Sequence, residues 1–442
     1  MDMVNGPIFS QVVRYALPLM LSGILQLLYN AADVVVVGRF AGPTALAAVS
    51  STGSLTALIV NVFMGLSVGT SVVVAQNYGA NRYRDVSEAV HTAVAISLLA
   101  GVVVAVFGVL AAKPLLQLMK NPPDVIDQSA LYMRIYFLGM PVNMIYNFGS
   151  AVLRAVGDTK RPLYFLTIAG IVNVLLNLFF VIALKMGVAG VATATVISQA
   201  VSMVLTIACL MRSEGSIHLD LKKLRLHKDK LVQIVRIGLP AGIQGSLFSI
   251  SNVIIQASIN AFGSTVMAAN GAAGNLEGFV YVGMNAFHQA ALSFSGQNMG
   301  ARRYDRLNKI LLACVGAVSV IGLALGMAAY LGSDFLLAIY TTEPDVVTIG
   351  KIRLLYLCVP YLLCGIMDVF AGQLRGMGAS LLPTVVTIVG VCGLRILWVY
   401  TIFAAMGTLE ILYLSYPVSW AVTAAAHFVC YLILHRRLAQ QS

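Results

Sequence analysis

Long apolar stretches with almost no charge recur along the whole chain and limit what it can fold into. Phe165–Leu184, Val191–Met211 and Cys314–Leu331 are three of them. A helix of about 20 apolar residues crosses the ~30 Å hydrocarbon core of a bilayer and pairs its backbone polar groups internally. Only 10% of the 442 residues are charged, against roughly 25% in soluble domains. The chain is therefore expected to be an all-α integral membrane protein.

Twelve such spans are expected, six in each half of the chain. The first six cover 12–38, 45–77, 87–112, 130–154, 161–184 and 188–211. The second six cover 234–261, 266–298, 308–332, 351–375, 381–406 and 410–435.

The two halves repeat each other in sequence. The string "AQNYGANRYRD" at 75–85 returns as "GQNMGARRYDR" at 296–306, and "LRAVGDTKRP" at 153–162 returns as "LRGMGASLLP" at 374–383. An even number of spans per copy inserts both copies in the same direction, as parallel repeats. We expect an N-terminal lobe (1–211), a cytoplasmic linker (212–233) and a C-terminal lobe (234–442). Gly79 and Gly300 stand where a helix C-cap glycine is expected.

The basic residues are distributed unevenly between the two predicted membrane faces. Of the 28 lysines and arginines, twenty fall on the face that holds both termini and the linker, and four on the other. This asymmetry indicates that both termini are cytoplasmic. It also accounts for the net charge of +11, so no nucleic-acid partner is expected.

Asp33 is the one acidic residue deep in the first predicted lobe. A carboxylate at membrane depth is costly and is a functional-site hypothesis by default. Gln26, Tyr29 and Asn30 precede it on the same predicted helix, and Gln26, Tyr29 and Asp33 share a face. Further polar residues of the same lobe that could join Asp33 in a pocket include Asn173 and Asn177, at i and i+4, and Thr195. Amides and hydroxyls of this kind also serve as bonds between membrane helices, without a functional role.

The second predicted lobe holds Glu277, His288 and Asp368 inside its spans. A histidine near a carboxylate can relay protons, and His288 follows Glu277 on roughly the same helix face. A structural role remains open for each of the three, including an ion pair between Asp368 and Arg375. Arg395 is a further candidate counter-ion for these acids.

No catalytic or metal-binding motif occurs in the sequence. It has no Walker loop, no HExxH and no nucleophile elbow, and its six cysteines lie in apolar spans without metal-ligand spacing to a histidine. We expect no enzyme, no metal centre and no cofactor, and any energy for transport would come from an ion gradient.

Four features of the sequence belong together: the duplicated six spans, the "DVVVVGR" string at 33–39, "GQNMGA" at 296–301 and "LRAVGDTKRP". In this combination the chain resembles the MATE (multidrug and toxic compound extrusion) family of bacterial type. The resemblance covers essentially the whole chain. It implies two six-helix lobes around a central cavity that exchange a cationic or amphiphilic compound for H⁺ or Na⁺ by alternating access. It also implies a bacterial inner-membrane protein, and we expect a monomer.

The resemblance assigns coupling-ion roles in the first lobe. Asp33, Asn173 and Thr195 match residues that bind the coupling ion, and a Na⁺ near Asp33 is one option. Asn177 stands where the related proteins usually have a second aspartate, which favours coupling to protons. Two alternatives stay open: a flippase for a lipid-linked precursor, and a channel or receptor-like membrane protein.

Overall fold

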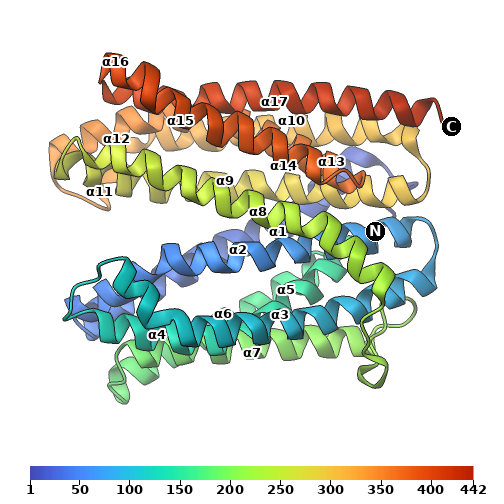
Figure 1. Ribbon diagram of the computed structural model, residues 1–442, viewed down its shortest axis with the longest axis horizontal. Coiled ribbons are helices and arrows are strands. Elements are labelled where there is room, and N and C mark those ends of the chain that lie inside the picture. Colours follow the sequence, from blue (N-terminus) through green and yellow to red (C-terminus); the bar gives the residue numbers. More distant parts are fainter. Residues whose placement is uncertain (442) are drawn as a thin grey trace. The chain divides into compact units, whose positions relative to one another are not determined.

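The computed structural model describes residues 1–441, and helices make up most of that range (Figure 1). The helices of the first repeat are α1 (Ile8–Phe40), α2 (Pro43–Gly79), α3 (Tyr83–Leu118), α4 (Ile126–Leu138), α5 (Met140–Ala155), α6 (Lys160–Leu178) and α7 (Val188–Arg212). Those of the second are α8 (Lys228–Asn260), α9 (Ser264–Gly300), α10 (Leu307–Leu331), α11 (Ser333–Ala338), α12 (Pro344–Leu357), α13 (Tyr361–Gly376), α14 (Leu381–Thr387), α15 (Leu394–Trp398), α16 (Ala404–Met406) and α17 (Leu409–Ala439).

The twelve expected spans correspond to these helices in order. Within residues 1–441, nine helices are long and apolar enough to cross a membrane, and the bent pair α12 and α13 makes ten. The remaining two spans are α9 and the broken pair α4 and α5. Much of α9 is buried in the protein, including Asn270, Glu277, Gln297 and Asn298. A helix that faces protein instead of lipid can carry such polar residues, and this lowers its mean hydropathy.

Irregular features of the helices recur in both repeats. Pro18 lies inside α1 and Pro240 inside α8. The fourth span is broken at Gly139 in the first copy and between α12 and α13, with a bend of 43°, in the second. The fifth span contains a π turn in each copy, at Phe179–Ala183 and at Ile388–Gly393, and the second copy has another at Val399–Phe403. The duplication therefore extends to the places where the helices deviate from ideal geometry.

The repeated polar string forms the same helix-terminating turn twice. Asn81 (φ 56°) and Arg302 (φ 55°) adopt the left-handed conformation. In the first copy the N–H of Arg82 donates to the carbonyl of Asn77 at 3.0 Å and that of Asn81 to Tyr78 at 3.1 Å, which is a Schellman motif. Gly79 and Gly300, expected near a helix end, are the last residues of α2 and α9, and the left-handed residue follows two positions later in each copy.

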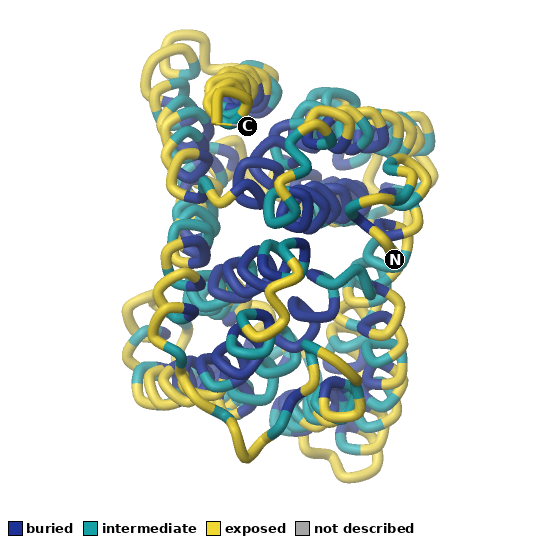
Figure 2. Tube along the Cα trace, turned by 90° about the vertical axis from the view of Figure 1, so that its right-hand side faces the viewer, coloured by how far each residue is buried: buried dark blue, intermediate teal, exposed yellow. Residues whose placement is uncertain are grey.

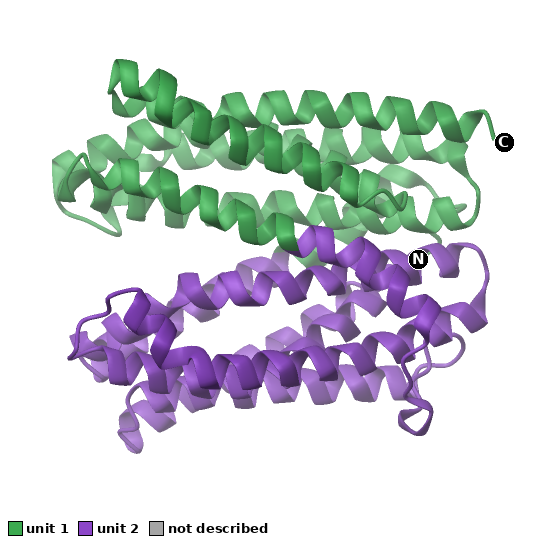
Figure 3. Cartoon of the chain, viewed as in Figure 1, with its two compact units in different colours: residues 1–20, 243–442 green, residues 21–242 purple. Residues whose placement is uncertain are grey.

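The contacts divide the chain into two compact units, shown in Figure 3. Unit 1 comprises Met1–Met20 and Ile243–Ser442, and unit 2 comprises Leu21–Gly242. These units differ from the expected lobes, 1–211 and 234–442, because the boundaries fall inside α1 and α8. Each repeat thus contributes the first part of its first helix to the bundle formed by the other repeat.

Unit 1 holds the N-terminal segment by polar contacts to the second repeat. Asn298 donates to the carbonyl of Met3 at 2.9 Å, Arg306 donates to that of Gly6 at 2.7 Å, and the hydroxyls of Tyr15 and Ser293 lie 2.8 Å apart. The segment begins with a turn in which the Asp2 carboxylate accepts from the backbone N–H groups of Asn5 and Val4. The bond from the Asn5 backbone is the main reason that the pKa of Asp2 lies below its ordinary value.

Unit 2 contains a close crossing of α2 and the first part of α8. A Cβ on Gly65 would lie 2.2 Å from the backbone nitrogen of Gly242, and one on Gly69 would lie 2.2 Å from the carbonyl oxygen of Ile234. Glycine is therefore required there for the two backbones to touch, as at small-residue interfaces of membrane helices.

Each unit has its own apolar core, and buried residues lie on the inner sides of the helices (Figure 2). In unit 2 the core includes Phe137, Met140, Met144 and Phe148. The core of unit 1 contains Phe287, Tyr413 and Trp420. The polar groups described below lie among these apolar side chains.

Candidate functional site

Asp33 lies in unit 2 with two asparagine amides at its carboxylate. Its Oδ1 accepts a hydrogen bond from Nδ2 of Asn173 at 2.9 Å and a second from Nδ2 of Asn177. The two asparagines lie one turn apart on α6, so that both face α1. The structure thus brings together three of the residues that the sequence singled out.

The two asparagines are placed to respond to the charge of Asp33. Asn173 and Asn177 are 5% and 0% exposed, and the Oδ1 atom of each is buried without a hydrogen-bond partner. With Asp33 ionised, the amide N–H groups donate to the carboxylate, as seen here. With Asp33 protonated, or with a cation beside it, the unpartnered amide oxygens are the suitable partners, because they accept a proton donor and ligate hard cations.

The other residues predicted for this pocket have different surroundings. Thr195 donates to the carbonyl of Val191 at 3.0 Å, on its own helix. Gln26 and Asn30 are exposed. Within residues 1–441 no hydrogen bond joins any of these three to Asp33, so the expected bonds from Asn30 and Thr195 are not formed here. Thr195 satisfies its hydroxyl locally, as β-hydroxy residues commonly do in helices.

Tyr29 lies one helical turn before Asp33 on α1 and packs against α6. Its hydroxyl donates to the carbonyl of Thr167 at 3.4 Å. A Cβ on Gly170 would lie 1.8 Å from Cε2 of the Tyr29 ring. Gly170 therefore makes room for the tyrosine, a role that the sequence analysis missed. Its position three residues before Asn173, on the same helix face, was the available signal.

Glu277, in unit 1, forms a buried ion pair with Arg353. The guanidinium donates from Nε to Oε1 at 2.6 Å and from Nη2 to Oε2 at 3.0 Å, and its Nη1 donates to Oδ1 of Asn270. Both side chains are about nine-tenths buried, with 8% and 10% exposed. This bidentate geometry is the strong form of a carboxylate–arginine pair. Nothing in the sequence indicated that Arg353 pairs with Glu277, because the two residues lie 76 positions apart in the chain.

His288 and Asp368 belong to a second group in unit 1. Nδ1 of His288 lies 2.6 Å from the backbone carbonyl oxygen of Asp368, while the Asp368 carboxylate interacts with Tyr281 and with the charge of Arg375. The relay expected between Glu277 and His288 is not formed. Eleven residues of helix place them roughly 16 Å apart along the axis, and each has another partner.

Arg395 does not act as a counter-ion for either acid. It is 1% exposed, and its Nε donates to Oγ of Ser419 at 3.0 Å. The ring of Tyr416 lies 4.4 Å from its guanidinium carbon, and that of Trp420 lies 5.9 Å away. Trp420 in turn stacks on Tyr361 at 5.2 Å. Aromatic rings therefore surround this arginine.

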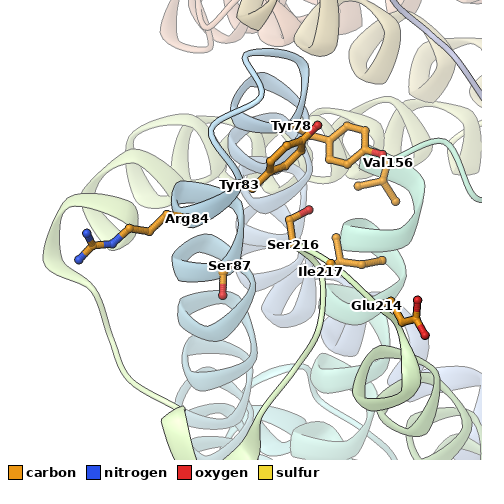
Figure 4. A pocket seen from close by; sticks show the side chains of 9 residues that line it. Tyr78, Tyr83, Arg84, Ser87, Val156, Glu214, Ser216 and Ile217 are labelled. Carbon is orange, nitrogen blue, oxygen red and sulfur yellow. The ribbon is translucent and has the colours of Figure 1, made fainter.

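A pocket of about 600 Å³ opens in unit 2 where α2 turns into α3. Figure 4 shows the rings of Tyr78 and Tyr83 meeting at one side of it, with Arg84 pointing away. Arg84 and Glu214 are the charged side chains of its lining, and no residue predicted from the sequence belongs to it. The lining carries one charge of each sign, and its exposed Arg84 is paired with Glu88 at 3.6 Å. This lining does not indicate any particular class of ligand.

Within residues 1–441 no cluster of three or more His, Cys, Asp or Glu side chains is arranged to hold a metal ion. The donor set that the structure places at Asp33 consists of one carboxylate and two amides.

Comparison with known sequences identifies a family. The family model MatE matches residues 18–179 and, a second time, residues 240–401. The chain is 30% identical over 418 residues to the probable multidrug resistance protein YoeA of Bacillus subtilis (strain 168), covering 92% of this chain and 90% of the relative. It is 24% identical over 381 residues to a protein named FAD transporter in Shewanella oneidensis, covering 84% of this chain and 83% of the relative.

Solved structures show the same fold. The outward-facing conformation of a multidrug resistance MATE family transporter of the MOP superfamily superposes with a TM-score of 0.92 at 23% identity, over 99% of this chain and 98% of the other. A MOP superfamily transporter from Pyrococcus furiosus superposes with a TM-score of 0.92 at 22% identity, over 99% and 98%. The arrangement as two parallel six-helix repeats is confirmed.

Proposed function

This chain belongs to the MatE family of multi-pass membrane transporters, and we propose that it exports cationic or amphiphilic compounds in antiport with H⁺, by alternating access. The observation that carries this proposal is the carboxylate of Asp33 held by the amides of Asn173 and Asn177. The names of the relatives support multidrug efflux as the task. The ion that drives it is inferred from the site.

The coupling follows from the two states of Asp33. The ionised carboxylate carries the one negative charge of this site and attracts a cationic compound. When a proton binds, the charge is lost, and the amides of Asn173 and Asn177 gain by turning their unpartnered oxygens toward the new donor. A ligand drives a conformational change only through its different affinities for the two states. Here the proton and the compound favour opposite charge states of one residue, which makes their binding competitive.

Protons are favoured over Na⁺ by the donor set. Na⁺ prefers several oxygen ligands, and a second carboxylate would strengthen its binding. Asn177 offers an amide instead, so a Na⁺ near Asp33 is the less favoured alternative. We further propose that the protein lies in a bacterial inner membrane. The distribution of basic residues favours an orientation with both termini cytoplasmic.

The test is efflux of a fluorescent cation from proteoliposomes with the pH gradient and the Na⁺ gradient imposed separately. Asp33→Asn should abolish efflux driven by the pH gradient while leaving the protein folded, because the amide mimics the protonated carboxyl. Asp127→Asn is the matched control, since Asp127 is an exposed partner of Lys113. Full coupled efflux by Asp33→Asn would remove this residue from the mechanism.

The same vesicles separate the alternatives. Asn177→Asp should raise the response to a Na⁺ gradient if the amide sets the ion preference. Saturation and counter-transport of the labelled compound identify a carrier, whereas a channel shows neither. Movement of a lipid-linked probe between leaflets, without efflux of the cation, would favour the flippase.

A further inference from the structure

Arg395 is a buried guanidinium that the coupling chemistry above does not use. It is 1% exposed in unit 1. Its Nε donates to Oγ of Ser419 at 3.0 Å, and its Nη1 donates to Oδ1 of Asn252 at 3.3 Å. Its Nη2 is buried and makes no hydrogen bond to any residue from 1 to 441. A charged donor in this situation requires an explanation, because buried polar groups in native proteins almost always have a partner.

No carboxylate within residues 1–441 compensates this charge by an ion pair. Glu277 is bound by Arg353 in a bidentate pair, and Asp368 interacts with Tyr281 and the charge of Arg375. Arginine stays protonated in proteins, so it cannot escape the cost of burial by becoming neutral. Among the described residues of unit 1, Arg353, Arg375 and Arg395 are the buried arginines. Arg353 and Arg375 each have an acidic neighbour, and Arg395 has none within residues 1–441.

Aromatic rings take the place of an acid around Arg395. The centroids of Tyr416, Phe248 and Trp420 lie 4.4, 5.3 and 5.9 Å from its guanidinium carbon. Cation–π contacts stabilise such a charge, but less than a charge-assisted hydrogen bond does. They leave Nη2 without an acceptor. The same rings give the guanidinium apolar, aromatic surroundings.

The helix that carries Arg395 is irregular on both sides of it. α15 (Leu394–Trp398) lies between the π turns Ile388–Gly393 and Val399–Phe403. π turns are rare and occur frequently at functional sites. The regular α-helical hydrogen bonding is therefore interrupted on both sides of Arg395.

We propose that Arg395 recognises the acidic group, a carboxylate, sulfonate or phosphate, of an amphiphilic aromatic compound. Nη2 donates to the acidic oxygens, and the rings of Tyr416 and Trp420 contact the apolar part of the compound. This inference rests on the proposed function as an exporter of amphiphiles and adds an acidic subclass to its cargo.

The test is equilibrium binding of two dyes that differ in one group. Rhodamine B carries a free carboxylate, and its ethyl ester is a cation with the same ring system. Each is titrated by fluorescence anisotropy into the purified full-length protein in nanodiscs, with no ion gradient. We expect Arg395→Gln to weaken rhodamine B at least tenfold, the loss typical of one charge-assisted hydrogen bond, and to change the ester less than threefold. Arg437→Gln, at the exposed end of α17, is the control and should change neither.

Arg395→Lys keeps the charge but loses the fork of donors, and it should weaken rhodamine B less than the glutamine variant does. If Arg395→Gln does not fold, the affinities of Arg395→Lys for the dye and the ester provide the comparison with the wild-type protein. Failure of the wild-type protein to bind rhodamine B, or equal losses for dye and ester, would overturn the inference. So would displacement of both dyes by chloride, which would identify an inorganic anion as the partner.

Because the readout is binding, the two proposals fail separately. A protein that discriminates the dyes through Arg395 but shows no efflux driven by an ion gradient would refute the proposed function and leave this inference standing.

Discussion

Breaking the buried ion pair between Glu277 and Arg353 should destabilise unit 1 strongly. The pair has two direct bonds, at 2.6 and 3.0 Å, and both side chains are about nine-tenths buried. Removal of one partner leaves a buried, uncompensated charge, which typically costs about 3–5 kcal/mol. We therefore expect Glu277→Gln and Arg353→Met each to lower the free energy of unfolding by about 4 kcal/mol.

The double variant should recover most of this loss. With both charges removed, neither partner is left uncompensated, and replacing a buried pair by neutral groups is often close to neutral. The remaining penalty is the bond that Arg353 makes to Asn270, about 1 kcal/mol. The coupling energy between the two sites is then well above ~0.5 kcal/mol, the deviation from additivity usual for distant, independent sites.

The tryptophans of the chain make this measurable. Trp398 and Trp420 both lie in unit 1 and are the only two in the sequence. Their fluorescence during a denaturant titration in detergent micelles therefore reports on the unit that contains the pair. Single variants that lose less than about 1 kcal/mol each, and that add in the double variant, would show that the pair contributes little to stability and would refute this reasoning.

Three further perturbations follow from the structure. A cysteine introduced by Ser216→Cys, in the loop after α7, should resist an impermeant thiol reagent applied to intact cells; labelling from outside would reverse the proposed topology. Gly69→Val should destabilise unit 2 by several kcal/mol, because its Cβ would lie 2.2 Å from the carbonyl oxygen of Ile234, and an unchanged melting profile would contradict the close crossing of α2 and α8. His91→Phe should increase proteolysis of the loop before α8, since Nε2 of His91 accepts the N–H of Asp220 at 3.1 Å; unchanged cleavage would show that the loop is held by other contacts.

The sequence predicted where two helices end but not which residue reverses the chain there. The repeated string at 75–85 and 296–306 predicted that a helix ends there, and α2 and α9 do end at Gly79 and Gly300. The left-handed residue is nevertheless Asn81 or Arg302. Several residues near a helix end can reverse the chain, and the choice depends on which hydrogen bonds close the turn.

The candidate site at Asp33 was predicted in part. The spacing of Asn173 and Asn177 placed them on one helix face, and the cost of a charge in the membrane singled out Asp33. The sequence could not predict that Thr195 bonds to the carbonyl of Val191 on its own helix and that Asn30 is exposed, because both depend on how the helices pack. Likewise Glu277 gave no sign of Arg353, whose position relative to α9 is decided by helix packing.

The sequence by itself determined that this protein spans a membrane and that it is a duplicated six-helix unit, and it singled out Asp33 as a candidate functional residue. These conclusions rest on hydropathy, internal similarity and the free energy of charge in lipid, all of which are properties of short segments. Only the tertiary structure decided that the first parts of α1 and α8 belong to the bundles of the opposite repeat. It alone decided that Glu277 has a counter-ion and that Arg395 has none within residues 1–441. Such pairings depend on which helix faces meet, and distant segments of the chain meet only in the folded protein.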